Sequence, residues 1–123
     1  MQDDDAQAIE AFIDTNPEIN APVLMTDAAA LRGRVIFERP DVACASCHNG
    51  PRFTDKQKYM MKGLGTVQTR SLVGIAASGP YLHDGRAQTL LDVIKQSRDG
   101  SMGNTGMLSN AEMDDLVAYL KSI

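Results

Sequence analysis

Cys44-Ala45-Ser46-Cys47-His48 is the stretch of sequence that decides the fold. On one turn of helix, positions i, i+3 and i+4 share a face, so the two thiols and the imidazole point the same way. Two thiols at this spacing can form thioether bonds with the vinyl groups of one haem, and the imidazole then comes under the iron as the proximal ligand. The motif predicts one covalent haem c, with Nδ1 of His48 donating to a backbone carbonyl.

Three other functions of these residues compete with haem attachment. A zinc site needs four ligands, and the chain has only two Cys and two His, so His83 would have to join the other three. A thioredoxin-like dithiol lacks its usual βαβ setting here. A disulfide between Cys44 and Cys47 would leave His48 without a role. Haem attachment is the interpretation that uses all three residues.

The residues leave several candidates for the sixth iron ligand. Met102 lies in the glycine-containing loop 99–106, whose backbone can pass close to a ring, just before the last predicted helix. His83 is an alternative ligand, although in its Pro-Tyr-Leu-His-Asp-Gly turn it can equally bond Asp84 or a haem propionate. Three other methionines could also ligate the iron, but each has a competing structural role: Met60 and Met61 could form a lid over the haem edge, and Met107 could be a helix staple or core residue. The sixth position could also be open.

Three side chains are candidate hydrogen-bond donors to the haem propionates: Arg70, Tyr81 and Arg86. The Gly79-Pro80 pair would turn the chain towards the ring. A solvated loop with a structural tyrosine is the competing interpretation of this segment.

Helical patterns account for most of the remaining chain. Four helices are predicted. The first begins at Asp3 to Asp5 and ends at Asn16-Pro17, and the second begins at Thr26 or Asp27 and runs to Glu38 before Pro40. The third begins at Thr89 and ends near Asp99-Gly100, and the fourth begins at the Ser109–Glu112 capping box. Gly33 within the second helix predicts a close helix crossing, against which Tyr119 can pack. No segment alternates as a strand, so we expect an all-α domain with long loops wrapped around a flat cofactor.

Composition limits the partners. The net charge of −4 argues against nucleic acid, and no stretch is long enough to span a membrane. Residues 51–70 nevertheless carry five basic side chains against one acid, Asp55, which predicts either a solvated face or a basic docking surface near the haem. We expect a monomer.

The N-terminal segment differs from the rest of the chain. Residues 1–20 carry six acids and no base, and two prolines lie within residues 17–22. The start also lacks the order of a secretion signal. We therefore expect residues 1–25 to be the tail of a preceding domain or a linker, and residues 26–123 to be the haem domain.

Several motifs together resemble the C-terminal haem domain of the bacterial di-haem cytochrome c peroxidase and MauG superfamily. The resemblance rests on residues 33–37, the attachment motif with Asn49-Gly50-Pro51 and Phe53, residues 69–72, Pro80-Tyr81-Leu82-His83-Asp84-Gly85-Arg86, Thr89-Leu90 and Leu108-Ser109. It implies a cytochrome c-like fold, a periplasmic or extracellular location, and Met102 as second axial ligand, because that group takes Met or Tyr from the loop before the last helix. The shorter loop, and Arg70 where the family often has Pro, depart from the pattern.

The same resemblance bears on activity. Those enzymes work with two haems, whereas this sequence has one attachment motif, which favours a one-electron transfer domain serving a redox partner protein or a fused haem domain. One alternative is a haem that reacts with peroxide, with His83 or Asp84 handling the proton. Another is a haem-based sensor module of a larger protein.

Overall fold

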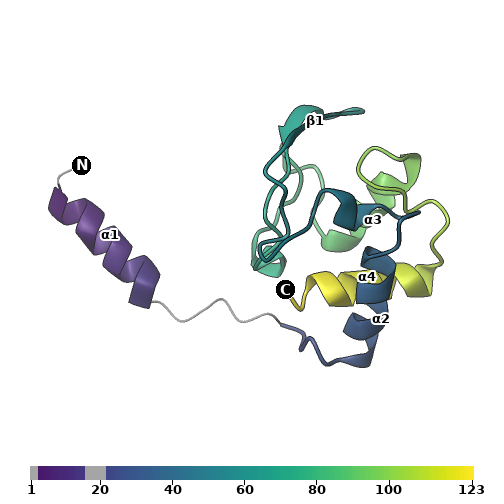
Figure 1. Ribbon diagram of the computed structural model, residues 1–123, viewed down its shortest axis with the longest axis horizontal. Helices are drawn as coiled ribbons and strands as arrows, with labels where there is room; N and C mark the ends of the chain where they lie inside the picture. The colour runs from purple at the N-terminus through teal and green to yellow at the C-terminus, as the bar shows by residue number, and fades with distance from the viewer. Residues whose placement is uncertain (1–2, 16–21) are drawn as a thin grey trace.

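The computed structural model describes residues 3–15 and 22–123. Within these residues, four α-helices and a two-stranded sheet are joined by long loops and three short 3₁₀ turns (Figure 1). The helices are α1 (Asp3–Thr15), α2 (Ala28–Phe37), α3 (Leu90–Gln96) and α4 (Asn110–Leu120); the strands are β1 (Lys58–Met61) and β2 (Gly65–Gln68); the 3₁₀ turns are η1 (Cys44–Ser46), η2 (Ile75–Ala77) and η3 (Ser97–Asp99).

The predicted helix starts are confirmed at atomic detail. The side chain of Asp27 accepts hydrogen bonds from the first turn of α2. Thr89 with Asp92, and Ser109 with Glu112, form reciprocal capping boxes at the starts of α3 and α4. Each box satisfies two backbone donors that a helix otherwise leaves unpaired. These local interactions place α3 and α4 where the sequence pattern predicts them.

Helices α2 and α4 cross at Gly33, as the sequence predicts. A Cβ atom built on Gly33 would overlap the backbone oxygen of Asp115 and lie 2.8 Å from Cβ of Tyr119. Only glycine permits this approach. Arg32 adds a bidentate ion pair to Asp115 beside the crossing, with both N–O distances at 2.8 Å. Figure 1 shows the two helices lying across each other below the hairpin.

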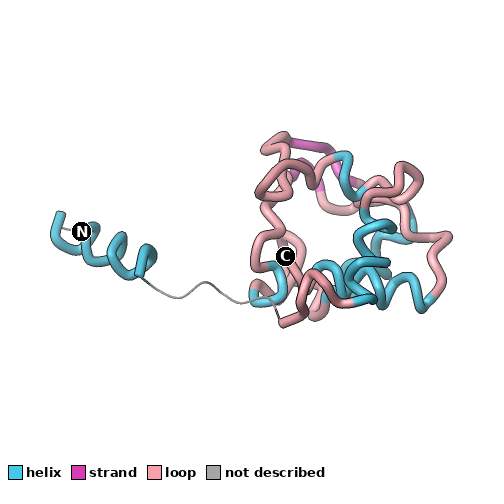
Figure 2. The backbone as a smooth tube through the Cα atoms, turned by 60° about the horizontal axis from the view of Figure 1, so that its bottom comes forward, coloured by secondary structure: helices cyan, strands magenta, loops and turns pink. Residues whose placement is uncertain are grey.

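A hydrophobic core forms between α2, α3, α4 and the segment that precedes η1. Its buried members are Ile36, Phe37, Val42, Leu90, Ile94, Leu108, Met113, Leu116, Tyr119 and Leu120. Loops make up much of the opposite side of the domain, as Figure 2 shows. Helices thus provide the scaffold, and loops carry the candidate site residues.

The expectation of an all-α chain is wrong in one respect. Strands β1 and β2 pair antiparallel, with Lys58 opposite Gln68 and Met61 opposite Gly65. Most of their side chains are exposed, and Met60 is 78% exposed. Neither face of this hairpin packs on the core, so the strands carry no alternation of apolar and polar residues for a sequence pattern to detect.

Helix α1 is N-terminal to all the other described elements and carries acidic residues in its first turn, as predicted. In Figures 1 and 2 it lies apart from the other elements. Asn16 and Pro17, which the sequence predicts to end this helix, lie outside the described residues, as does part of the expected connector, residues 18–21. No helix in the described parts of the chain is long and apolar enough to cross a membrane.

Candidate haem-binding site

The two cysteines and His48 lie on one short turn, as predicted. The amide of His48 donates to the carbonyl oxygen of Cys44 at 3.0 Å, and the amide of Cys47 donates to the same oxygen at 3.4 Å. Ala43, just before the turn, has a left-handed conformation with φ 63°. This backbone gathers two thiols and an imidazole within five consecutive residues. Both cysteines are free thiols.

The Cys44 thiol does not have the environment of a metal thiolate or a redox dithiol. Burial raises the pKa of the Cys44 thiol to about 11, so this thiol stays protonated at neutral pH. Reactive dithiols depend on a lowered thiol pKa. In residues 3–15 and 22–123, no group of three or more Cys, His, Asp or Glu is arranged to hold a metal ion. These observations disfavour the zinc and thioredoxin-like alternatives.

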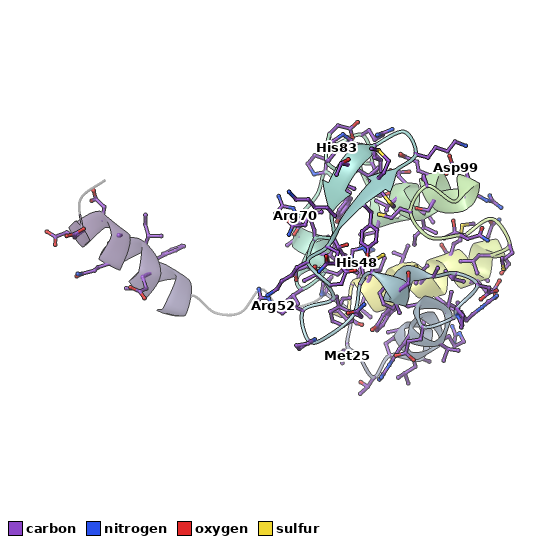
Figure 3. The ribbon with its side chains drawn as sticks, turned by 45° about the horizontal axis from the view of Figure 1, so that its top comes forward. Met25, His48, Arg52, Arg70, His83 and Asp99 are labelled. Atoms are coloured by element: carbon purple, nitrogen blue, oxygen red, sulfur yellow. The ribbon has the colours of Figure 1, made fainter. Side chains whose placement is uncertain are left out.

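The imidazole of His48 is oriented by the backbone. Its Nδ1 lies 3.1 Å from the carbonyl oxygen of Phe53. A carbonyl oxygen only accepts, so the proton sits on Nδ1 and the lone pair remains on Nε2. Burial lowers the pKa of His48, while the carbonyl groups of Phe53 and Arg70 partly offset this effect. The neutral ring is the form that ligates iron, and Figure 3 shows His48 within the domain.

Phe53 is held in place by the helix crossing. Its ring makes edge-on contacts with Phe37 of α2 and Tyr119 of α4, with centroids 6.2 and 6.5 Å away. Phe37 and Tyr119 also contact each other at 5.2 Å. Aromatic pairs of this geometry each contribute about 0.5–1.5 kcal/mol beyond area burial. The α2–α4 scaffold therefore fixes the carbonyl that orients His48.

A cavity of about 280 Å³ opens beside Met102. Its apolar lining comes from the hairpin turn, the 80–87 loop, α3 and the loop before α4: Leu64, Leu82, Val93 and Met102. Lys62 and Arg86 also line it. Apolar side chains with two cations nearby suit a flat apolar ring that carries carboxylates, although Asp99 also lines the cavity. Cys44, Cys47 and His48 do not line this cavity, so it lies on the Met102 side of the candidate site.

The loop that carries Met102 packs against the attachment motif. Gly103 has φ 74°, and a Cβ atom there would lie 2.8 Å from the carbonyl oxygen of Val42 and 3.8 Å from Sγ of Cys44. The amide of Asn104 donates to the same Val42 oxygen at 2.8 Å. The structure thus brings the loop of Met102 next to Cys44, two regions that are 58 residues apart (102 minus 44).

The other candidate ligands lie in different surroundings. Met60 is exposed on β1, while Met61 is half-buried on the same strand. Met107 is 51% exposed, so the expectation of a core position is wrong. Its sulfur instead accepts a contact from Arg39 at 3.7 Å. His83 is exposed, and Figure 3 shows it near the hairpin end of the domain, away from His48.

The three candidate propionate donors differ in what they already bind. Arg86 is paired with Asp84, and its Nη2 donates to the carbonyl oxygen of Gly63 at 2.9 Å. The hydroxyl of Tyr81 donates to the carbonyl oxygen of Ala76 at 3.3 Å. The side chain of Arg70 is exposed. Of the three, only Arg86 lines the cavity.

Residues that sequence analysis missed lie on the histidine side. Tyr59 donates to the Asp55 carboxylate at 2.5 Å, and the amide of Asp55 donates to the Cys47 carbonyl oxygen at 3.0 Å. The sequence signal was weak, because Asp55 is the single acid within a basic stretch and Tyr59 lies on a strand that the pattern does not reveal.

Taken together, these residues fit a covalently attached haem. Two free thiols and an imidazole share one turn, with Nδ1 of the imidazole already hydrogen-bonded to the backbone. A partly apolar cavity containing a thioether sulfur lies where loop 100–106 meets this turn.

Comparisons with known proteins agree with this site. A protein-family model described as cytochrome c matches residues 30–123. The chain is 30% identical over 122 residues to methylamine utilization protein MauG of Methylophilus methylotrophus, covering 77% of this chain and 36% of that protein. It is 47% identical over 57 residues to the gamma subunit of hydrazine synthase from Kuenenia stuttgartiensis, covering 45% of this chain and 16% of that subunit. The MauG match confirms the superfamily resemblance.

A solved structure also matches over nearly the whole chain. It is hydrazine synthase of Kuenenia stuttgartiensis pressurized with xenon, with a TM-score of 0.77 and 25% identity over 95% of this chain and 54% of that one. The present chain therefore spans about a third of MauG and about half of the matched hydrazine synthase chain.

Proposed function

The chain belongs to the cytochrome c family, and we propose that it is a single-haem domain for one-electron transfer. Membership in this family implies covalently bound haem c. We assign its attachment to Cys44 and Cys47 and its axial ligation to His48 and Met102. The observation that carries the proposal is the hydrogen bond between Nδ1 of His48 and the Phe53 carbonyl, which leaves the Nε2 lone pair available to bind a metal.

When bound, the haem supplies an iron that accepts and releases one electron. The residues of this chain determine how readily the iron changes its oxidation state. A backbone-bound imidazole and a packed scaffold keep the proximal ligand fixed in both oxidation states. Leu64, Leu82 and Val93, which line the cavity beside Met102, would give a bound ring apolar contacts.

Met102 is the second axial ligand in this proposal. It lines the cavity, and its loop packs on the attachment motif, whereas Met60, Met107 and His83 are exposed. A thioether opposite an imidazole stabilises ferrous iron and raises the reduction potential, which suits an electron carrier.

The haem carboxylates need cationic or hydroxyl partners. Arg86 is the first candidate because it lines the cavity, and Arg70, Tyr81 and His83 remain candidates as hydrogen-bond donors. Arg86 would have to share its guanidinium with Asp84 and Gly63, which five donors permit.

The exposed basic side chains of residues 51–70 support a docking face for an acidic redox partner or a fused haem domain. These side chains are Arg52, Lys56, Lys58, Lys62 and Arg70. Electrons would enter near residues 51–64. We place the domain in the periplasm or outside the cell, as a monomeric unit of residues 26–123 preceded by a tail, residues 1–25.

One set of spectra tests the proposal. The chain is matured in a host that assembles c-type haem, and optical and EPR spectra are recorded in both oxidation states. We expect haem that resists acidified acetone, low-spin ferric iron, and a methionine-to-iron charge-transfer band that disappears in Met102→Ala. His83→Ala and Met60→Ala are the matched controls and should keep the band. A band unaffected by Met102→Ala would reject this ligand assignment.

The superfamily resemblance favours a second candidate, a haem that reacts with peroxide. In that case the distal side is open, and His83 or Asp84 handles the proton. High-spin ferric iron, cyanide binding by the folded protein and peroxide turnover with a reductant would replace the electron-transfer proposal.

A further inference from the structure

A carboxylate and a phenol lie beside the haem-attachment turn, on the side of His48. The hydroxyl of Tyr59 donates to Oδ2 of Asp55 at 2.5 Å, and the amide of Gln57 donates to Oδ1 at 2.9 Å. The amide of Asp55 donates to the carbonyl oxygen of Cys47 at 3.0 Å. Asp55 is thus tied to an attachment residue through its backbone amide, and both oxygens of its carboxylate accept a hydrogen bond.

The local backbone is strained to produce this arrangement. Phe53 and Lys56 both have positive φ, at 53° and 60°, a conformation that is unfavourable for residues other than glycine. Thr54 stabilises the segment between them, because its hydroxyl donates to the Thr69 carbonyl oxygen at 2.7 Å and accepts from the Lys56 amide at 3.0 Å. The same segment presents the Phe53 carbonyl to His48 and the backbone amide of Asp55 to the carbonyl of Cys47.

Electrostatic effects tie Asp55 and Tyr59 to the candidate haem ligands. Burial is the largest cause of the lowered pKa of His48, and the charge of Asp55 is a smaller effect that opposes it. The pKa of Tyr59 is raised first by its hydrogen bond to Asp55 and next by the side chain of Cys47. The hydrogen bond from Tyr59 is also the largest cause of the lowered pKa of Asp55. No Lys or Arg among the described residues forms an ion pair with Asp55.

We propose that Asp55 lowers the reduction potential of the haem through its negative charge, and that Tyr59 acts as the positioning residue that holds this charge beside Cys47. The inference rests on the proposed haem attachment. Ferric haem carries one more positive charge than ferrous haem, so a fixed carboxylate nearby stabilises the ferric state more. The Tyr59 hydroxyl keeps the carboxylate from rotating into solvent.

The test is the midpoint potential of the holoprotein, measured by spectroelectrochemistry at constant pH and ionic strength. Asp55→Asn removes the charge and keeps the shape, so we expect a higher midpoint, seen as a several-fold larger ferrous-to-ferric ratio at a fixed ambient potential. Tyr59→Phe should raise the midpoint by less, because the Asp55 carboxylate keeps its charge but is no longer held in one position. Asp114→Asn, which removes an exposed charge on α4, is the matched control and should leave the midpoint unchanged.

The double variant separates positioning from a general structural effect. If Tyr59 acts through Asp55, Tyr59→Phe has no further effect in the Asp55→Asn background. An equal shift in both backgrounds, or an unchanged midpoint in Asp55→Asn, would overturn the inference. Should Asp55→Asn fail to take up haem, Tyr59→Phe alone decides, and an unchanged midpoint overturns it.

The outcomes also distinguish this inference from the proposed function. A wild-type chain that attaches no haem in a competent host contradicts the proposed function and, with it, this inference. If the wild-type chain carries covalent low-spin haem and Asp55→Asn has the same midpoint potential, only the inference is contradicted.

Discussion

Gly33 lies in direct contact with the backbone of Asp115, and no larger residue fits between them. In an exposed helix, Gly→Ala stabilises by about 1 kcal/mol. Here the added methyl group must push α2 from α4, which costs about 1–3 kcal/mol or more. We expect Gly33→Ala to lower the Tm of the holoprotein by several degrees in circular dichroism. Leu31→Ala, at a half-exposed position on α2, should change it little; a higher Tm in Gly33→Ala would contradict the crossing.

The ion pair between Arg32 and Asp115 should make stability depend on pH. Hydrogen bonds from Arg32 are the largest cause of the lowered pKa of Asp115. A carboxyl with a lower pKa in the folded state stabilises the fold above its unfolded value of about 3.9, and the contribution is lost as pH falls through the folded-state pKa. Asp115→Asn should therefore lower the urea midpoint at pH 7 and have a smaller effect below about pH 3. Asp114→Asn is the control, and a pH-independent loss in Asp115→Asn would exclude this origin.

The capping box of α4 should contribute measurably to stability. The Ser109 hydroxyl accepts from the amide of Glu112 at 3.2 Å, and the Glu112 carboxylate accepts from the amide of Ser109 at 2.9 Å. Ser109→Ala should cost about 1 kcal/mol in urea unfolding. Ser109→Asp keeps an acceptor at the cap and should restore most of the loss. If both variants unfold alike, the hydroxyl is not the stabilising group.

Arg86 should anchor the hairpin. Its guanidinium links the turn at Gly63 to Asp84, across the mouth of the cavity. Arg86→Gln should speed amide hydrogen exchange in β1 and β2 while exchange in α2 and α4 stays as in the wild type. Unchanged exchange in the hairpin, together with a shifted midpoint potential, would instead indicate that Arg86 serves mainly a propionate.

Much of the scaffold was predictable because its determinants are local. Asp27, Thr89 and Ser109 cap helices through neighbours two or three residues away, and such spacing is visible in a sequence. The Gly33 crossing was also predictable, since a glycine inside an amphipathic helix lowers helix stability and is typical of a close contact with a neighbouring element. The attachment motif is equally local, with all three donors within five residues.

The rest depends on contacts that sequence spacing does not encode. The hairpin has two solvated faces, so Lys58 to Met61 shows no strand periodicity. The contact of Gly103 with Val42 and Cys44 joins segments far apart in the chain. The Tyr59–Asp55 pair requires the strained turn at Phe53 and Lys56, and no propensity predicts positive φ at those residues.

The partner of His48 is a main-chain oxygen, and this has a consequence for how the protein can vary. Any residue at position 53 retains its carbonyl, so no single replacement there deletes the acceptor. Substitutions can therefore displace the imidazole only if they change the backbone conformation around residue 53. Adjustment of the iron's electronic properties is thereby left to side chains around the ligand, which can change one at a time without loss of coordination.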